Sequence, residues 1–332
     1  MSRSKSKPSN KRVPTIRDVA KLAGVSIATV SRALNRTDHP VNEATKSKVL
    51  DAAKKLGFRP NAAAQTLLTR TTSTLGVLVP DISNPYYASI LQGVQRVAEK
   101  AGYYTLLGNT DRDPRRQAEH LAVFAAKRVE GVCVLGGTMS ESDSQIVQSL
   151  GIPVAVIGRH PVSFASVRVD NVEIGRIATE YLLKTGCTSI AFFAGPSSST
   201  TMRDRVDGYQ QALGDEGQVL WGELTPDWGS HAAQQVEVDG IVCGNDLVAL
   251  GVLHGLTEKN KRVPQDVSVI GCDDIGIARN TLPPLTSVTI PSMQLGEQVV
   301  KLLLKIIENN DVPQEPVMLP VQLHVRSSTR AL

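Results

Sequence analysis

One short segment carries side chains that suit a charged, hydrogen-bonding surface. The segment GVSIATVSRAL, residues 24–34, begins with a turn signal, and Val30, Ala33 and Leu34 fall at helical spacing. The residues that remain on its outer face are Ser26, Ile27, Thr29 and Arg32. Hydroxyl and guanidinium groups hydrogen-bond phosphates and base edges, so this face has the chemistry to bind nucleic acid.

The distribution of charge agrees with a polyanionic partner. Residues 1–70 contain 15 Lys and Arg and 4 Asp and Glu, which leaves 21 basic (36 − 15) and 28 acidic (32 − 4) residues in the rest. The first 13 residues are predicted to form a disordered basic tail. Basic residues continue beyond this tail among helix-forming residues, so we predict a folded, basic, nucleic-acid-binding region.

Residues 14–58 are predicted to form three helices around a small core. Thr15 is a plausible N-cap of the first helix, with Asp18 at its third position and Val19, Ala20 and Leu22 facing inward. After Gly24-Val25, Ser26 caps a second helix, which gives a helix-turn-helix. A third helix follows Asn42 and ends at Gly57. Its predicted inward residues are Ala44, Val49, Leu50, Ala53 and Leu56.

Residues 59–73 are predicted to form a hinge helix and linker. The run RPNAAAQTLLTR favours a helix but is shorter than an isolated helix needs to be stable in water. We therefore expect a helix that forms only when it packs against something else.

From residue 74 the pattern indicates two doubly wound parallel-sheet lobes. Short apolar runs such as LGVLVP and VSVIGCDD alternate with amphipathic runs. The segment 162–169 is interpreted as the first crossing between the lobes. We therefore expect a first lobe of residues 74–160 and 291–322 and a second of 161–290 and 323–332. Loops that follow strands should converge at a ligand site.

The sequence lacks the common catalytic and metal motifs. It contains no GxGxxG after a strand, no P-loop lysine, no GxSxG and no HExxH. Its four cysteines, Cys133, Cys187, Cys243 and Cys272, form no CxxC pair. The N-terminus has no apolar signal region, and no apolar run reaches the length of a membrane span. We expect a cytoplasmic protein without metal, catalytic cofactor or membrane partner.

The motifs resemble a known family. The runs TIRDVAKLAGVSIATVSRALN, VNEATKSKVLDAAKKLGFRPNAAAQTL, GNDLVALGVL and VPQDVSVIGCDDI closely resemble the LacI/GalR family of bacterial transcription regulators. The resemblance extends over nearly all of the chain after Val13. It implies a helix-turn-helix headpiece, a hinge, and a core like a periplasmic sugar-binding protein.

The resemblance also implies which residues contact DNA. The second helix enters the major groove, with Ile27 and Ala28 at the main specificity positions and Leu67 as a wedge in the minor groove. The full set of implied DNA-binding residues is Thr15, Ser26, Ile27, Ala28, Thr29, Ser31, Arg32, Asn35, Asn61, Ala64 and Leu67. The partners implied are a double-stranded operator and a second copy of the chain, as a homodimer and possibly a tetramer.

An effector pocket is implied in the core. Its expected residues are Asn84, Tyr86, Tyr87, Arg159, Arg205, Trp228, Asn245 and Asp273. Gly158 and Ile290 stand where related sugar binders often have an acid and a glutamine. We therefore expect a small sugar or nucleoside, of ribose type, rather than a hexose.

Two other classes of protein share parts of this pattern. A cytoplasmic sugar-binding protein would explain residues 75–332 but not the helix-turn-helix. An enzyme on a doubly wound fold would lack a recognisable catalytic motif here. Within the regulators, control by an inducer and control by a co-repressor use the same pocket, so both remain open.

Overall fold

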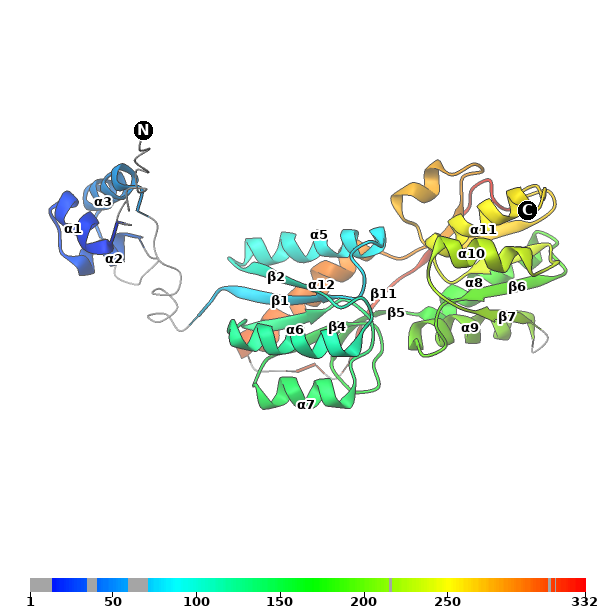
Figure 1. Cartoon of the computed structure of the whole chain (residues 1–332), viewed down its shortest axis with the longest axis horizontal. Helices are drawn as coiled ribbons and strands as arrows, with labels where there is room; N and C mark the ends of the chain where they lie inside the picture. The colour runs from blue at the N-terminus through cyan, green and yellow to red at the C-terminus, as the bar shows by residue number, and fades with distance from the viewer. Residues whose placement is uncertain (1–13, 35–40, 59–70, 215–216, 310–311, 314) are drawn as a thin grey trace, which may run out of the picture. The chain divides into compact units, whose positions relative to one another are not determined.

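The computed structural model describes residues 14–34, 41–58, 71–214, 217–309, 312–313 and 315–332 (Figure 1). The chain divides into two compact units, Met1–Thr72 and Ser73–Leu332. We call the described part of the first unit the headpiece and the second unit the core.

The headpiece contains the three predicted helices. They are α1 (Ile16–Ala23), α2 (Ile27–Leu34) and α3 (Glu43–Leu56). The side chains of Val19, Val30 and Val49 are fully buried at their common centre. The predicted caps are confirmed: Asn42 Oδ1 accepts a hydrogen bond from Thr45 N at 2.8 Å, and Gly57 has a left-handed φ of 63°.

Three predicted core positions in the headpiece are wrong. Leu22 is 51% exposed and Leu50 is 47% exposed, and Ala44 is also exposed. In α1 the inward stripe follows the helical spacing i, i+3, i+4, i+7, so Leu22 lies off it. Leu50 lies beside the buried Val49 in the sequence, about 100° further round the helix.

The first lobe of the core is a parallel sheet covered on both faces. Its six strands lie in the order β11-β5-β4-β3-β1-β2. The strands are β1 (Thr74–Val79), β2 (Tyr104–Asn109), β3 (Gly131–Val134), β4 (Val154–Ile157), β5 (Ala165–Val169) and β11 (Val317–Leu319). The helices are α5 (Pro85–Lys100), α6 (Pro114–Ala126), α7 (Glu141–Ser149) and α12 (Ser292–Asn309). Helices α5 and α12 pack on each other, and α6 packs on α7.

The second lobe repeats this plan with one antiparallel edge. Its sheet has the order β12-β10-β9-β8-β6-β7, and only the β10–β12 pair is antiparallel among the described strands of this sheet. The strands are β6 (Ile190–Ala194), β7 (Gln218–Trp221), β8 (Gly240–Cys243), β9 (Ser268–Asp273), β10 (Thr286–Thr289) and β12 (Gln322–His324). The helices are α8 (Asn171–Lys184), α9 (Thr200–Leu213), α10 (Pro226–Gln234), α11 (Asp246–Glu258) and the 3₁₀ turn η1 (Gly276–Asn280).

The chain crosses between the lobes three times, and the predicted boundaries need correction. Strand β5 pairs with β4 and β11, so 165–169 belongs to the first lobe and the first crossing follows Val169. Pairing on both sides makes β5 an interior strand of this sheet and not a linker. The second crossing lies between Thr289 and Ser292, and the third between Leu319 and Gln322, slightly before the predicted position.

Candidate functional site

The outer face of α2 presents the predicted DNA-reading side chains. Ile27 is 46% exposed, and Ala28 and Arg32 are also exposed. Ser26 Oγ accepts a hydrogen bond from Thr29 N at 3.1 Å and lies 2.9 Å from Thr29 Oγ1. The hydroxyl of Ser26 therefore caps the helix that it was predicted to begin.

Two further predicted DNA-binding residues lie within the headpiece, and four fall outside the residues that the structure describes. The hydroxyl of Thr15 donates a 2.7 Å hydrogen bond to the carboxylate of Asp18, and the backbone N–H of Thr15 donates a second at 2.8 Å. Ser31 lies on α2 and is half-buried. The predicted residues outside the described ranges are Asn35, Asn61, Ala64 and Leu67.

The loops that were expected to converge in the core do so. A cavity of about 510 Å³ is lined by residues of both lobes. Of the eight predicted effector-binding residues, seven line it: Asn84, Tyr86, Tyr87, Arg159, Arg205, Asn245 and Asp273. They come together because the carboxyl ends of parallel strands meet at one edge of each sheet.

A buried arginine and aspartate form the polar centre of this cavity. The side chain of Arg205, on α9, is only 5% exposed, and its Nη1 lies 4.0 Å from Asp273 Oδ1. Its Nε donates to Asn171 Oδ1 at 3.0 Å, and its Nη1 donates to the carbonyl oxygen of Gly244. These contacts fix the guanidinium, so its free edge can be presented to a ligand.

Asp273 is unusual in both its backbone and its proton affinity. Burial raises the pKa of its carboxyl group to about 7, although the Arg205 guanidinium favours the ionised form. The residue also has a φ of 107°, outside the range that non-glycine residues normally adopt. Such strain persists only where the surrounding structure holds the backbone in place.

Asn245 has two roles. Its side chain accepts a hydrogen bond from Val248 N at 2.9 Å and so caps α11. It also lines the cavity and is 3% exposed. One lone pair of its oxygen accepts the capping hydrogen bond, and the amide also carries two N–H donors that suit a ligand oxygen.

Two tyrosines supply aromatic surface from α5. The rings of Tyr86 and Tyr87 pack edge to face with their centroids 5.1 Å apart. Burial raises the pKa of both phenols, so their hydroxyls remain protonated at neutral pH. Asn84 caps the same helix, accepting from Tyr86 N at 3.0 Å.

Arg159 lines the cavity but is engaged in an ion pair between the lobes. It follows β4 of the first lobe and pairs with Asp204 on α9 of the second, its Nε lying 3.3 Å from Asp204 Oδ2. Thr200 Oγ1 also donates to the Arg159 carbonyl oxygen at 3.0 Å. The arginine therefore joins the two lobes at the cavity as well as lining it.

The prediction for Trp228 is wrong. Trp228 does not line the cavity; its ring packs edge to face on Phe193 at a centroid distance of 5.9 Å, against the apolar core of the second lobe. It lies on the first turn of α10, whose interior side packs on α11. An aromatic residue near a strand end was therefore a core residue and not a sugar platform.

The structure adds residues that sequence reasoning missed. Arg112 lies in the loop after β2, and Asn171 begins α8 just after the first crossing; both line the cavity. Ser199 and Thr201, at the start of α9, line it too. Arg112 and Ser199 follow strands at their carboxyl ends, so the rule that found the other loops would also have found them.

Gly158 and Ile290, the two positions that differ from the sugar-binder pattern, both line the cavity. Ile290 lines it and is 2% exposed, in the second crossing. Gly158 lines it as well, and a Cβ added there would meet no atom within 4 Å. An apolar side chain therefore stands at one of these positions, and the other carries no side chain.

The described ranges contain neither a metal-binding cluster nor a membrane-spanning helix. No group of three or more His, Cys, Asp or Glu residues there is arranged to hold a metal ion. No helix in those ranges is both long and apolar enough to span a bilayer.

A helix-turn-helix headpiece joined to a two-lobed ligand-binding core defines a ligand-controlled, DNA-binding regulator. Residues 15–61 match the model of bacterial regulatory proteins of the lacI family, and residues 179–329 match a periplasmic binding protein-like domain. The regulator RegA of Clostridium saccharobutylicum is 34% identical over 329 residues, which cover 95% of this chain and 99% of RegA. The chain belongs to the LacI family of bacterial transcription regulators, and so to a family of regulators rather than enzymes.

Solved structures agree with this assignment. The Lac repressor dimer bound to operator and the anti-inducer ONPF matches with a TM-score of 0.87 at 26% identity, over 96% of this chain and 100% of that one. The regulator CelR in complex with cellobiose matches with a TM-score of 0.73 at 32% identity, over 95% and 99%. A LacI-family regulator from Enterococcus faecium with bound ribose matches with a TM-score of 0.72 at 29% identity, over 78% and 99%.

Proposed function

We propose that the protein is a repressor that binds a palindromic operator as a homodimer and is controlled by a small polyhydroxylated effector in the core cavity. The observation that carries the proposal is the set of buried polar side chains of Arg205, Asp273 and Asn245 at the cavity between the lobes, with the half-buried Asn171 accepting a hydrogen bond from Arg205. A ligand that contacts both lobes favours one arrangement of them over another, which is the requirement for a shift in population.

We further propose a ribose-type sugar or a nucleoside as the effector. The polar cluster around Arg205 suits ribose hydroxyls, which need fixed donors and acceptors. The lining also contains the apolar side chains of Leu135, Ile157 and Ile290, which suit a nucleobase face rather than the further hydroxyls of a hexose. The related structures hold different sugars, ribose in one case and cellobiose in another, so the lining of this cavity is the better guide.

Calorimetry tests the effector class. Ribose, uridine, adenosine, glucose, galactose and gluconate are titrated into the full-length protein. Binding of ribose or a nucleoside, abolished by Arg205→Ala, is the expected result. Tight binding of a hexose with no heat from ribose or the nucleosides would refute the proposed class.

Selection of binding sites from random DNA tests the operator. Two equal headpieces related by a two-fold axis should select an inverted repeat. Binding should weaken steeply with salt because Lys and Arg displace counterions from phosphates. Recovery of single, asymmetric half-sites would contradict the homodimer.

Gel shifts of the selected DNA then separate the two modes of control. A ligand that binds the cavity and releases the DNA is an inducer, and one that strengthens the complex is a co-repressor. If every ligand that binds in calorimetry leaves the gel shift unchanged, the cavity does not regulate DNA binding.

A further inference from the structure

Two of the cavity residues are each followed in the sequence by a buried aspartate. Asn245 and Asp273 line the cavity, whereas Asp246 and Asp274 do not. Asp246 is 0% exposed, and the side chain of Asp274 is 1% exposed. A buried carboxylate is costly unless it is paired, so the partners of these two residues indicate what they do.

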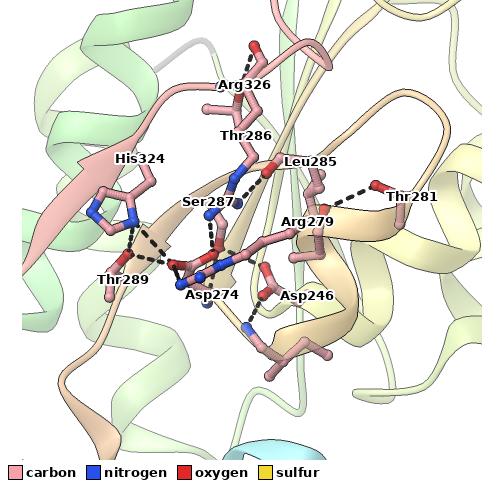
Figure 2. A network of polar contacts seen from close by, with 12 residues as sticks. Asp246, Asp274, Arg279, Thr281, Leu285, Thr286, Ser287, Thr289, His324 and Arg326 are labelled. Carbon is pink, nitrogen blue, oxygen red and sulfur yellow. Dashed lines mark hydrogen bonds and ion pairs between the residues drawn. The ribbon is translucent and has the colours of Figure 1, made fainter.

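Asp274 is the centre of a network of polar contacts (Figure 2). Its Oδ1 accepts from Arg326 Nη2 at 2.6 Å. Its Oδ2 accepts from Thr289 Oγ1 at 3.0 Å and lies 3.0 Å from His324 Nδ1 and 3.5 Å from Arg279 Nη2. Its backbone N–H donates to Ser287 Oγ at 3.1 Å. One carboxylate thus joins the η1 turn, β10 and the C-terminal segment.

The contacts lie near two of the crossings, one where the chain leaves the second lobe and one where it returns to it. Thr289 is the last residue of β10, directly before the second crossing, and Ile290 after it lines the cavity. His324 is the last residue of β12, the strand that follows the third crossing. Thr289 Oγ1 and His324 Nδ1 are also only 2.9 Å apart. Asp274 therefore contacts residues of two second-lobe strands, β10 and β12, that adjoin the second and third crossings.

The same network holds the backbone that aims Asp273 at the cavity. Asp273 and Asp274 have φ values of 107° and 52°, two successive non-glycine residues with positive φ. Asp246 holds the backbone at the following residue, Ile275. Its Oδ2 accepts a hydrogen bond from Ile275 N at 2.8 Å, and its Oδ1 accepts one from Ser287 Oγ at 2.7 Å. Ser287 thus links both buried aspartates to β10.

The charges around Asp274 favour its ionised form. Burial raises the pKa of Asp274, but hydrogen bonds from Arg326 and His324 outweigh burial and hold the pKa below its usual value. The other charged groups that face it are Arg279 and the buried Asp246. An asparagine would have nearly the same size but would remove the negative charge that Arg326 and His324 contact.

We propose that Asp274 is a positioning residue. It connects the backbone at Asp273, beside the cavity, to the strand ends next to the second and third crossings, and thereby determines the relative arrangement of the two lobes. It acts through Asp273, Thr289 and His324, and has no direct contact with the cavity. The inference rests on the proposed function only in treating the cavity as the effector site.

Distances between spin labels on the two lobes test this inference without any ligand. Labels are attached at Glu141→Cys in the first lobe and Glu258→Cys in the second, both at exposed positions, in the full-length chain. The four native cysteines are buried. Labelled chain is diluted into excess unlabelled chain, so that distances within one protomer are measured. In Asp274→Asn the distribution should broaden or gain a second population relative to the wild type.

Three controls make the result specific. A pair within the second lobe, Glu223→Cys with Glu258→Cys, should keep its distribution, whereas a general loss of structure would change it. Asp266→Asn removes a carboxylate that pairs with Arg262 elsewhere in this lobe, and should leave the lobe distance unchanged. Circular dichroism establishes that each variant is folded.

Thr289→Val covers the case in which Asp274→Asn does not fold. It removes one hydroxyl donor to Asp274 with little change in shape, and should broaden the same distribution to a smaller degree. Wild-type distributions in the folded variants would overturn the inference. They would leave the proposed function untouched, because operator and effector binding are measured separately.

Discussion

Replacing Asp273 by asparagine should make the protein more stable at neutral pH and should leave its stability in acid almost unchanged. Asparagine resembles the protonated carboxyl group in size and in neutrality. In the wild type the folded state keeps a proton on Asp273 up to about pH 7, whereas the unfolded chain releases it near the ordinary value of 3.8. An asparagine side chain does not titrate, so the substitution removes this difference between the two states.

The size of the effect follows from the two pKa values. Between them the folded state binds more protons than the unfolded state, so the wild type loses stability as pH rises through this window. A shift from 3.8 to about 7, at about 1.4 kcal/mol per pH unit, amounts to about 4 kcal/mol over the whole window. The contribution is fully present below the unfolded value and is lost above the folded one.

Urea denaturation of both proteins, followed by far-ultraviolet circular dichroism, measures the difference. The advantage of Asp273→Asn in the free energy of unfolding should grow by about 2–3 kcal/mol between about pH 5 and about pH 8. Asp266→Asn is a control whose difference from the wild type should stay constant over this range. The Arg262 guanidinium holds the pKa of Asp266 below its usual value, so this carboxyl group is already ionised in both the folded and the unfolded state above about pH 5. An Asp273→Asn advantage that stayed constant or shrank with rising pH would refute the reasoning.

Three further substitutions test the packing and the caps. Ser26→Ala removes the α2 cap and should lower the stability of the headpiece by about 1 kcal/mol; an unchanged headpiece transition in calorimetry would contradict the cap. A Cβ at Gly93 would overlap the carbonyl oxygen of Met293, so Gly93→Ala should separate α5 from α12 and cost about 1–3 kcal/mol. A wild-type urea midpoint would show that the helices do not pack so closely. Trp228→Phe should lower thermal stability because it weakens the ring contact with Phe193, and should leave effector affinity unchanged in calorimetry. Lower effector affinity with unchanged thermal stability would show that Trp228 binds the effector after all.

Local signals in the sequence were enough to predict the three helices of the headpiece and where they begin and end. Its helix ends depend on contacts between residues three positions apart, as between Ser26 and Thr29 or Asn42 and Thr45. Such contacts form within one turn of helix and need no knowledge of the rest of the fold. Leu22 was misplaced because a strongly apolar side chain on a short helix can lie off the buried stripe.

Strand pattern and chain direction determined most of the cavity. Apolar runs indicated parallel strands, and parallel strands bring their following loops to one edge, which brought Tyr87, Asn245 and Asp273 together. The same rule extends to Arg112 in the loop after β2.

Only the tertiary structure decided which lobe β5 joins, that Trp228 is a core residue, and that Asp274 contacts Thr289 and His324. These outcomes depend on pairing and packing between segments far apart in the chain; Asp274 and Arg326, for example, are 52 residues apart. A buried carboxylate and an exposed one look alike in a sequence, because burial and partners are properties of the folded chain.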